Sequence, residues 1–294
     1  MSDRIIKIIL PLLLMSAMIF VSCETRSYSV VKSPDVSVTE GSADYEGFRV
    51  DNIMHYNDGL RDLHFHLYIP PEYDGSEPYA LYITLPGHGA YIYCEGDIGL
   101  VLSLEGYAVN SRKYNDRMIV VAAQLEDIEG EYEDIEDEFA VHSEQVIRLT
   151  EYMISNYNID RDKVYISGYS RGGRVMCRIC TKRPDLYSAV MAISSKWEED
   201  PSVIVKNRLP VYFVTGEEDE AFGSDPFRET YEQIVSMYKE EGLSDEQIGK
   251  LVVLDIKDQD YFDEAGCESQ HIGGEKLFSE DEGVMKRFLD HERE

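Results

Sequence analysis

Short apolar segments rich in β-forming residues alternate with longer amphipathic segments, and this alternation constrains the fold of the chain more than any other feature. The predicted strands are 48–55, 62–69, 79–85, 117–123, 163–167, 187–193, 210–215 and 250–256, and the predicted helices are 141–157, 172–182, 226–241 and 279–292. Strands that alternate with helices pair in parallel through crossover connections. The later strands are nearly continuous apolar runs, as in strands covered on both faces, whereas the first two alternate and lie close together in the chain. We therefore expect an α/β fold with a mostly parallel central sheet, helices on both faces and an antiparallel N-terminal strand pair.

The first 23 residues have the features of an export signal. Arg4 and Lys7 precede an apolar stretch at 8–21, which is short for a membrane span of about 20 residues. With the cysteine that follows, the segment resembles a bacterial lipoprotein signal, which implies cleavage and lipid attachment at Cys23. The chain would then be exported and anchored at the cell membrane, facing outside the cytoplasm. Phe20 stands where such signals usually have Leu, so ordinary cleavage or an uncleaved anchor remain alternatives.

Two further stretches have a biased composition. Residues 24–44 are rich in Ser, Thr and Val without a sustained apolar period, which predicts a flexible tether before a folded domain at 45–294. The formal net charge of −29 argues against nucleic acid as a partner, because a phosphate-binding surface needs clustered Lys and Arg. Much of this charge lies at 126–138, for which a solvated loop and helix entrance, a calcium site and a lid are all open interpretations.

The segment GYSRGG at 168–173 lies between a predicted strand and a predicted helix. Gly168, Ser170 and Gly172 fit the pattern G-x-S-x-G, in which the serine occupies a strained strand-to-helix turn and the glycines let the backbone approach closely. A serine hydroxyl is a weak nucleophile at neutral pH, so a histidine must accept its proton and a carboxylate must orient that histidine. Ser170 is therefore a candidate nucleophile if the chain supplies both partners.

Candidates for both partners follow Ser170 in the chain. His271 and His291 are the histidines after it, and His291 lies near the C-terminus on a charged predicted helix, so His271 in the predicted loop GCESQHIGGEK is the expected base. The strand 210–215 runs into an acidic segment at the sheet edge where catalytic groups gather in open α/β folds. Asp219 is the first choice for the acid, and its competitors are Glu217, Glu218 and Glu220.

Backbone N–H donors must also be available, because acyl transfer passes through an oxyanion. Arg171, the residue after the candidate nucleophile, would supply the first amide. The second is expected from the segment LPGHGA at 85–90, through the amide of His88 or Gly89.

These residues together resemble the α/β-hydrolase family, and within it the secreted esterases related to polyhydroxybutyrate depolymerases and feruloyl esterases, with prolyl oligopeptidase-type hydrolases close by. The resemblance covers about 45–294 and is most specific in YNIDRDKVYISGYSRGGRVMCRICTKRPDLYSAVMAISS at 157–195; GEEDE and QHIGG look like the family's acid and histidine loops. It implies an α/β-hydrolase fold, a triad of Ser170, Asp219 and His271, and no cofactor or metal. Two departures, LPGHGA in place of the commoner His-Gly opening and Arg171 where a small or nonpolar residue is frequent, leave the substrate open.

Two side chains are candidates for substrate contacts. Arg171 could bind a carboxylate or stabilise an acyl group, or it could pair with a local acid. Trp197, the only tryptophan, could form a flat wall for a sugar or an aromatic acyl group, or pack in the core. In the fold that the resemblance implies, the loops of Cys94 and Cys267 converge on the serine, so we predict a disulfide between them on the oxidising side of the membrane.

The sequence therefore predicts an exported, membrane-tethered serine hydrolase whose substrate is a small-molecule or polysaccharide-linked ester. One alternative is a serine peptidase of the prolyl oligopeptidase type. Another is a binding lipoprotein that has the same fold without the chemistry. The oligomeric state is left open by the sequence.

Overall fold

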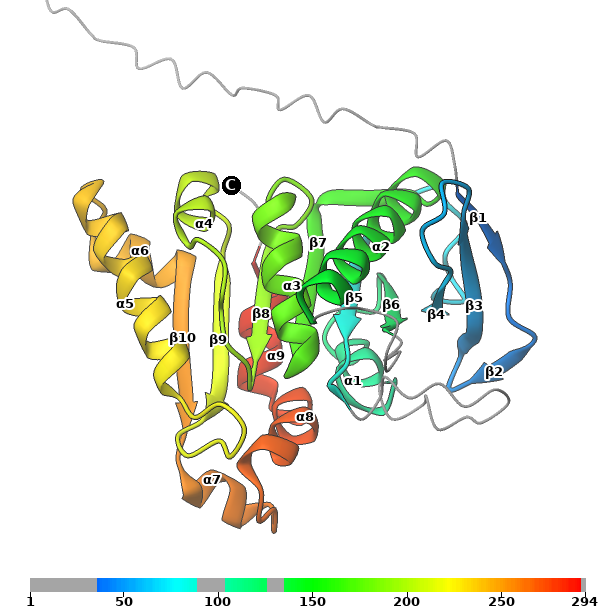
Figure 1. Cartoon of the computed structure of the whole chain (residues 1–294). Helices are drawn as coiled ribbons and strands as arrows, with labels where there is room; N and C mark the ends of the chain where they lie inside the picture. Colours follow the sequence, from blue (N-terminus) through cyan, green and yellow to red (C-terminus); the bar gives the residue numbers. More distant parts are fainter. Residues whose placement is uncertain (1–35, 89–103, 126–134, 292–294) are drawn as a thin grey trace, which may run out of the picture. The chain divides into compact units, whose positions relative to one another are not determined.

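The computed structural model describes residues 36–88, 104–125 and 135–291, which contain a ten-stranded sheet (Figure 1). Its strand order is β1-β3-β4-β6-β5-β7-β8-β9-β10, with β2 paired to β3 off this path. The strands are β1 Val36–Thr39, β2 Ala43–Tyr45, β3 Phe48–Tyr56, β4 Leu63–Tyr68, β5 Tyr79–Leu85, β6 Met118–Gln124, β7 Ile159–Tyr169, β8 Ala189–Ile193, β9 Val211–Gly216 and β10 Val252–Lys257.

The type of strand pairing changes once along the sheet, from antiparallel to parallel. From β6 to β10 all neighbouring strands are parallel, whereas β1 to β4 pair antiparallel and β4 joins β6 antiparallel. This confirms the predicted mostly parallel sheet with antiparallel N-terminal strands. All the parallel strands end at the same edge, and the candidate site residues lie at that edge.

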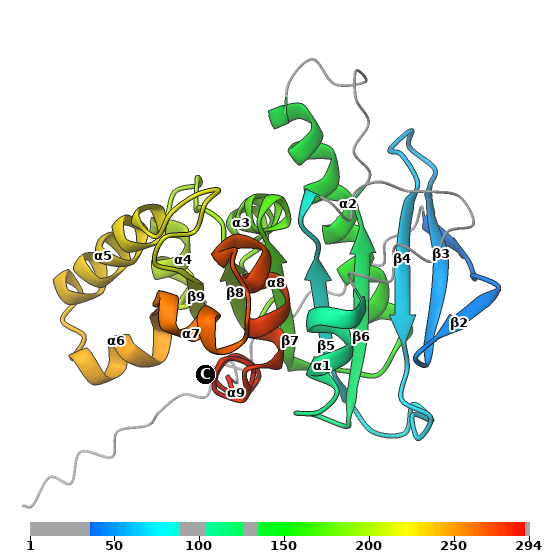
Figure 2. The same cartoon turned by 90° about the horizontal axis from the view of Figure 1, so that it is seen from below.

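Helices cover both faces of the sheet, as Figure 2 shows. On one face lie α2 Ile135–Asn156, α3 Arg171–Lys182, α4 Ser202–Asn207 and α5 Asp225–Glu240, and on the other lie α1 Val109–Ser111, α8 Gln270–Glu280 and α9 Glu282–Leu289. The remaining helices are η3 Leu104–Ala108, α6 Asp245–Leu251 and α7 Gln259–Glu264.

The two helical layers explain why the central strands are apolar at almost every position. Successive side chains of a strand point to opposite faces, so each face of a covered strand must be apolar. In β5, Ile83 packs in the core under α2 and α3, and its neighbour Tyr82 packs in the core under η3, α8 and α9. In β9, Phe213 likewise packs in the same core as Ile83, and its neighbour Tyr212 packs in the same core as Tyr82.

Part of the predicted tether is a strand. Residues 36–39 form β1 and pair antiparallel with residues 53–56 of β3, and β2 begins at Ala43. Val36 and Val38 are partly buried against the core, and Ser37 and Thr39 face solvent, which is the period of a half-buried edge strand. The tether prediction is therefore wrong for residues 36–44, and residues 24–35 lie outside the described residues.

The predicted histidine loop is also wrong, because its second half is the helix α8. Ser269 caps this helix by accepting a hydrogen bond from the Ile272 amide (3.1 Å). Gly273 and Gly274 weaken the helical pattern in the sequence, yet Gly273 lets the helix approach Phe262 of α7 and Gly274 lets it lie against the sheet. A Cβ atom at Gly274 would lie 2.6 Å from Oγ of Ser194 at the end of β8. The predicted helix at 279–292 is α9, which begins at Glu282.

The strand assignment of residues 36–39 predicts an asymmetric response to charge. Val38→Asp should destabilise the folded state by about 1–2 kcal/mol, because it places a carboxylate against the apolar core. Ser37→Asp, on the solvent face of the same strand, should stay within about 0.5 kcal/mol of the wild type. Urea unfolding followed by circular dichroism measures both values. Equal effects of the two variants would contradict the strand and support the tether.

Candidate active site

Ser170 occupies a sharp turn between the last residue of β7 and the first residue of α3. Its backbone has φ 51° and ψ −119°, a conformation that costs free energy in a non-glycine residue. The neighbouring glycines permit the turn, because a Cβ at Gly168 would lie 2.5 Å from the Gly172 carbonyl oxygen. One at Gly172 would lie 2.4 Å from the carbonyl oxygen of Pro86. The G-x-S-x-G spacing is therefore required by close backbone packing at this turn.

Hydrogen bonds hold the strained residue in place. The Ser170 amide donates to the Ile193 carbonyl of β8 (2.9 Å), and its carbonyl accepts from the Gly173 amide (3.0 Å) and from Oγ of Ser195 (2.6 Å). Ser170 is 8% exposed. The backbone of Ser170 is thus fixed by hydrogen bonds to β8, to the residues that follow it and to α3.

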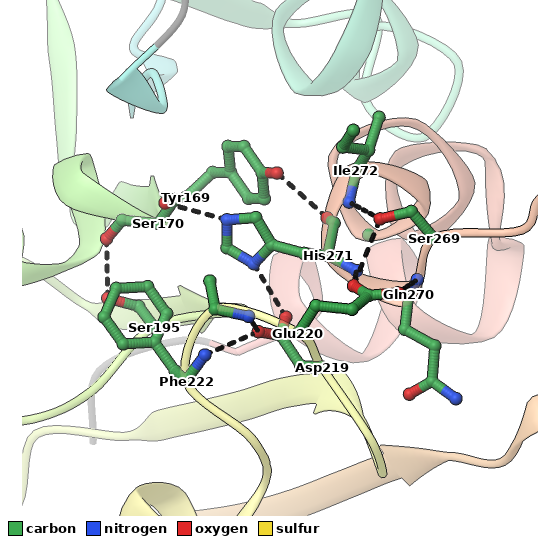
Figure 3. Close-up of polar contacts among 12 residues, drawn as sticks. Tyr169, Ser170, Ser195, Asp219, Glu220, Phe222, Ser269, Gln270, His271 and Ile272 are labelled. Carbon is green, nitrogen blue, oxygen red and sulfur yellow. Dashed lines mark hydrogen bonds and ion pairs between the residues drawn. The ribbon is translucent and has the colours of Figure 1, made fainter.

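The side chains of Ser170, His271 and Asp219 form a hydrogen-bonded line (Figure 3). Oγ of Ser170 lies 3.0 Å from Nε2 of His271, and Nδ1 of His271 lies 2.8 Å from Oδ2 of Asp219. A carboxylate can only accept, so Nδ1 carries a proton and Nε2 of the neutral ring is left as an acceptor for the serine hydroxyl. The arrangement can remove a proton from Ser170.

Of the four candidate acids, Asp219 is the one whose carboxylate binds the imidazole of His271. Its side chain is completely inaccessible to solvent, and Oδ1 accepts from the amides of Ala221 (3.0 Å) and Phe222 (2.9 Å). Burial alone would raise the pKa of Asp219, but the bond from His271 and the two amides outweigh it and hold the pKa below its usual value. The group therefore remains an anion at neutral pH.

Glu220, the competitor next to Asp219, contacts the backbone of the histidine. Its carboxylate accepts from the amides of Gln270 (3.0 Å) and His271 (2.8 Å) and from Oγ of Ser269 (3.1 Å). These amides lie in the first turn of α8, where backbone donors lack helical partners and favour an anion. Adjacent residues of one loop thus hold the side chain and the backbone of His271. The sequence carries no signal for this role, since the partners are about 50 residues apart.

Tyr169 supports the histidine from the other side. Its hydroxyl donates to the His271 carbonyl oxygen (2.9 Å), and its ring centroid lies 5.3 Å from that of the imidazole. The ring also fills the space beside Gly87, where a Cβ would lie 2.5 Å from it. The residue before the candidate nucleophile therefore packs against both the histidine and the segment after β5.

The segment after β5 lies directly beside Ser170, as a second oxyanion donor would require. A Cβ at Gly87 would be 3.5 Å from the Cβ of Ser170. His88 is exposed, and its Nδ1 accepts a hydrogen bond from the Arg171 guanidinium (2.9 Å). Gly89, the other expected donor, lies outside the described residues.

The side chain of Arg171 pairs with a local acid. Its Nη2 bonds both carboxylate oxygens of Glu138 in the first turn of α2, and these side chains are 13% and 7% exposed. This confirms the local-acid interpretation and leaves little of the guanidinium for a substrate carboxylate. Of the acidic run 126–138, residues 126–134 lie outside the described residues.

Trp197 belongs to the core. It is 8% exposed and packs edge-on against Phe213 of β9 with a centroid distance of 6.0 Å. The expectation that it forms an exposed wall for substrate is therefore wrong, and core packing, the alternative, is the observed role.

The predicted disulfide is contradicted at one of its two cysteines. Cys267 is a free thiol whose Sγ donates to the Ser269 carbonyl (3.3 Å), while Cys94 lies outside the described residues. Cys177 and Cys180 are buried thiols on α3, and burial raises the pKa of both. Within the described ranges, no group of three His, Cys, Asp or Glu side chains could hold a metal ion.

Comparison with known proteins identifies the fold. The sequence profile of the prolyl oligopeptidase family matches residues 136–197, which include the turn at Ser170. The crystal structure of a thermostable esterase matches with a TM-score of 0.63 and 18% identity over 84% of this chain and 64% of that one. The fold is that of the α/β-hydrolases. The structure of oligopeptidase B from Leishmania major shares this hydrolase fold, with a TM-score of 0.52 and 13% identity over 87% of this chain.

The chain spans 64% of the length of the esterase and 36% of that of the oligopeptidase. No curated protein matches its sequence. The shared α/β-hydrolase fold therefore describes the architecture, and the chemistry must be argued from the residues at the site.

The buried Asp219 predicts a specific loss of stability in acid. Its pKa lies below the unfolded value of about 3.9, so its contribution to stability is fully present above that pH and is lost as the pH falls through the folded pKa. Below about pH 4, the unfolding free energy of the wild type should therefore fall more steeply than that of Asp219→Asn. Urea unfolding at about pH 3 to 6, a range that brackets the reference pKa of Asp, measures how steeply the unfolding free energy depends on pH.

A matched control for this experiment is Asp260→Asn, which removes an exposed carboxylate from α7. It should follow the wild-type curve. Parallel curves for the wild type and Asp219→Asn would show that the buried hydrogen bonds of Asp219 do not favour its ionised form.

Proposed function

We propose that the protein is a serine hydrolase that cleaves an ester through a covalent acyl-enzyme. The observation that carries this proposal is the line of hydrogen bonds from Ser170 through His271 to Asp219. It lies at the edge of an α/β-hydrolase sheet, on a turn whose strained serine is fixed by its neighbours. This combination provides a nucleophile, a base and an orienting anion within contact distance.

In the proposed reaction, Oγ of Ser170 attacks the ester carbonyl while Nε2 of His271 accepts its proton. The imidazolium is stabilised by Asp219, and it then donates the proton to the departing alcohol. Water, activated by the same histidine, attacks the acyl-enzyme and releases the acid and the free serine.

The oxyanion would be held by backbone amides in both steps. We assign the Arg171 amide as the first donor, because it follows the nucleophile at the start of α3. The second would come from the amide of His88 or Gly89. The proposed chemistry requires no cofactor or metal.

Esters of small molecules or of polysaccharides, including acetyl and feruloyl groups, are the proposed substrates, because the motifs resemble those of secreted esterases. A serine peptidase of the prolyl oligopeptidase type is the second candidate, which the match of that family's profile to residues 136–197 favours. Both reactions would use the same three side chains, so the distinction lies in the substrate.

We also propose that the protein is exported and anchored through a lipid on Cys23. This rests on the sequence of the first 23 residues, which lie outside the described residues. No helix in the described part of the chain has the length and apolarity to span a bilayer.

Hydrolysis of p-nitrophenyl acetate and of feruloyl esters by purified protein tests the proposed function. The wild type should turn over, and Ser170→Ala and His271→Ala should each lower kcat/KM by about 10⁴-fold or more, with Asp219→Asn in the same direction. His55→Ala, which removes a partly exposed histidine of β3 paired with Asp62, is the control and should remain within about twofold of the wild type.

Ester and amide substrates with the same acyl group separate the two candidates. A p-nitrophenyl ester and the corresponding p-nitroanilide of one acyl-peptide differ at the scissile bond. The esterase proposal predicts turnover of the ester alone. Comparable turnover of the anilide would support the peptidase, and no turnover of either by folded wild type would support a binding protein.

A further inference from the structure

Arg171 links three segments of the chain that meet at the candidate site. It is the first residue of α3, next to Ser170, and its guanidinium reaches both Glu138 on α2 and His88 after β5. Glu138 is in turn contacted by Nε2 of His142, one turn further along α2, at 3.4 Å. The contacts therefore run from α2 through the nucleophile turn to the proposed oxyanion segment.

The pair of Arg171 and Glu138 is too buried to be a surface ion pair. Burial alone would raise the pKa of Glu138, but its contacts with His142 and Arg171 outweigh that effect and the net pKa is lowered. Two bonds from one guanidinium nitrogen to both carboxylate oxygens fix the direction of the arginine side chain. With its orientation fixed, the guanidinium can hold the acceptor nitrogen of His88 at 2.9 Å.

We propose that Glu138 is a positioning residue of the hydrolase, which orients Arg171 so that its guanidinium holds the His88 segment against the nucleophile turn. This inference rests on the proposed function. The two segments carry the backbone amides assigned to the oxyanion, and such donors stabilise a transition state only when they are fixed in advance. Glu138 itself touches no reacting atom.

A neighbouring pair on the same two helices provides a matched control. Glu136, two residues before Glu138, contacts Arg178 (2.5 Å) and Arg174 (3.7 Å) on α3, and its side chain is 52% exposed. Glu136→Gln therefore weakens the packing of α2 on α3 without touching the contact between Arg171 and His88.

The test uses p-nitrophenyl acetate, a neutral substrate too small to need an arginine for binding. Glu138→Gln should lower kcat about 10- to 100-fold, somewhat less than the loss of a whole oxyanion donor, and leave KM within about twofold. Glu136→Gln should leave both constants within about twofold of the wild type. Loss of kcat at constant KM is the signature of weaker transition-state stabilisation.

The double variant Glu138→Gln, Arg171→Met separates positioning from folding. Glu138→Gln alone leaves a buried guanidinium without its carboxylate, which destabilises the folded state, and the double variant removes both charges. Thermal unfolding should show stability recovering in the double variant, while its kcat remains low because the bond to His88 is gone. If Glu138→Gln does not fold, the kcat of the folded double variant still tests the positioning role.

Each possible result supports or contradicts the inference. If kcat recovers with stability in the double variant, or if Glu138→Gln keeps the wild-type kcat, the positioning role is wrong and the proposed hydrolase stands. If folded wild type does not hydrolyse any ester tested, the proposed function and this inference fall together. If kcat is low in both Glu138→Gln and the double variant while Glu136→Gln remains as active as the wild type, the inference is supported.

Discussion

The strained backbone of Ser170 depends on close packing that only glycine allows. Gly168, Gly172 and Gly173 bring the end of β7, the start of α3 and the loops after β5 and β8 to distances that a single methyl group would prevent. The cost of the conformation is offset by the hydrogen bond that the Ser170 amide donates to Ile193 and by those that its carbonyl accepts from Ser195 and Gly173. The same packing places the segment after β5 beside the serine, so the position of the proposed oxyanion donors follows from the geometry of the turn.

The rest of the candidate site is organised around His271. The ring is held by the buried Asp219, the backbone amide of His271 is bound by Glu220, and its carbonyl is bound by Tyr169. The acidic loop after β9 could have been explained by solubility alone. Two adjacent carboxylates of this loop instead bind His271, Asp219 at the ring and Glu220 at the backbone amide. Because α8 packs through Gly273 and Gly274 against its neighbours, the histidine is carried by a well-supported helix, which limits its freedom to move away from Ser170.

Local pattern predicted most of the fold. The apolar runs located the eight strands β3 to β10 and the turn at Ser170. Chain order selected His271, and the acidic segment after the strand 210–215 made Asp219 the first choice for the acid. The errors have physical causes: Val36 and Val38 form too short a strand for its period to stand out, and two glycines concealed α8. Contacts distant in sequence carry no local signal, so Glu220, the partnership of Arg171 with Glu138 and the burial of Trp197 could not be read from the chain. The disulfide expected at Cys267 is wrong because Cys267 is a free thiol, and Cys94 lies outside the described residues.

Reaction of the folded protein with a fluorophosphonate, followed by peptide mass mapping, tests the central claim most directly. The probe forms a stable adduct only with a serine whose hydroxyl is activated by a base. Our account predicts one adduct, on the peptide that contains Ser170, and its disappearance in His271→Ala. An unlabelled wild type, or an adduct on a different serine, would contradict the assignment of Ser170 as the nucleophile.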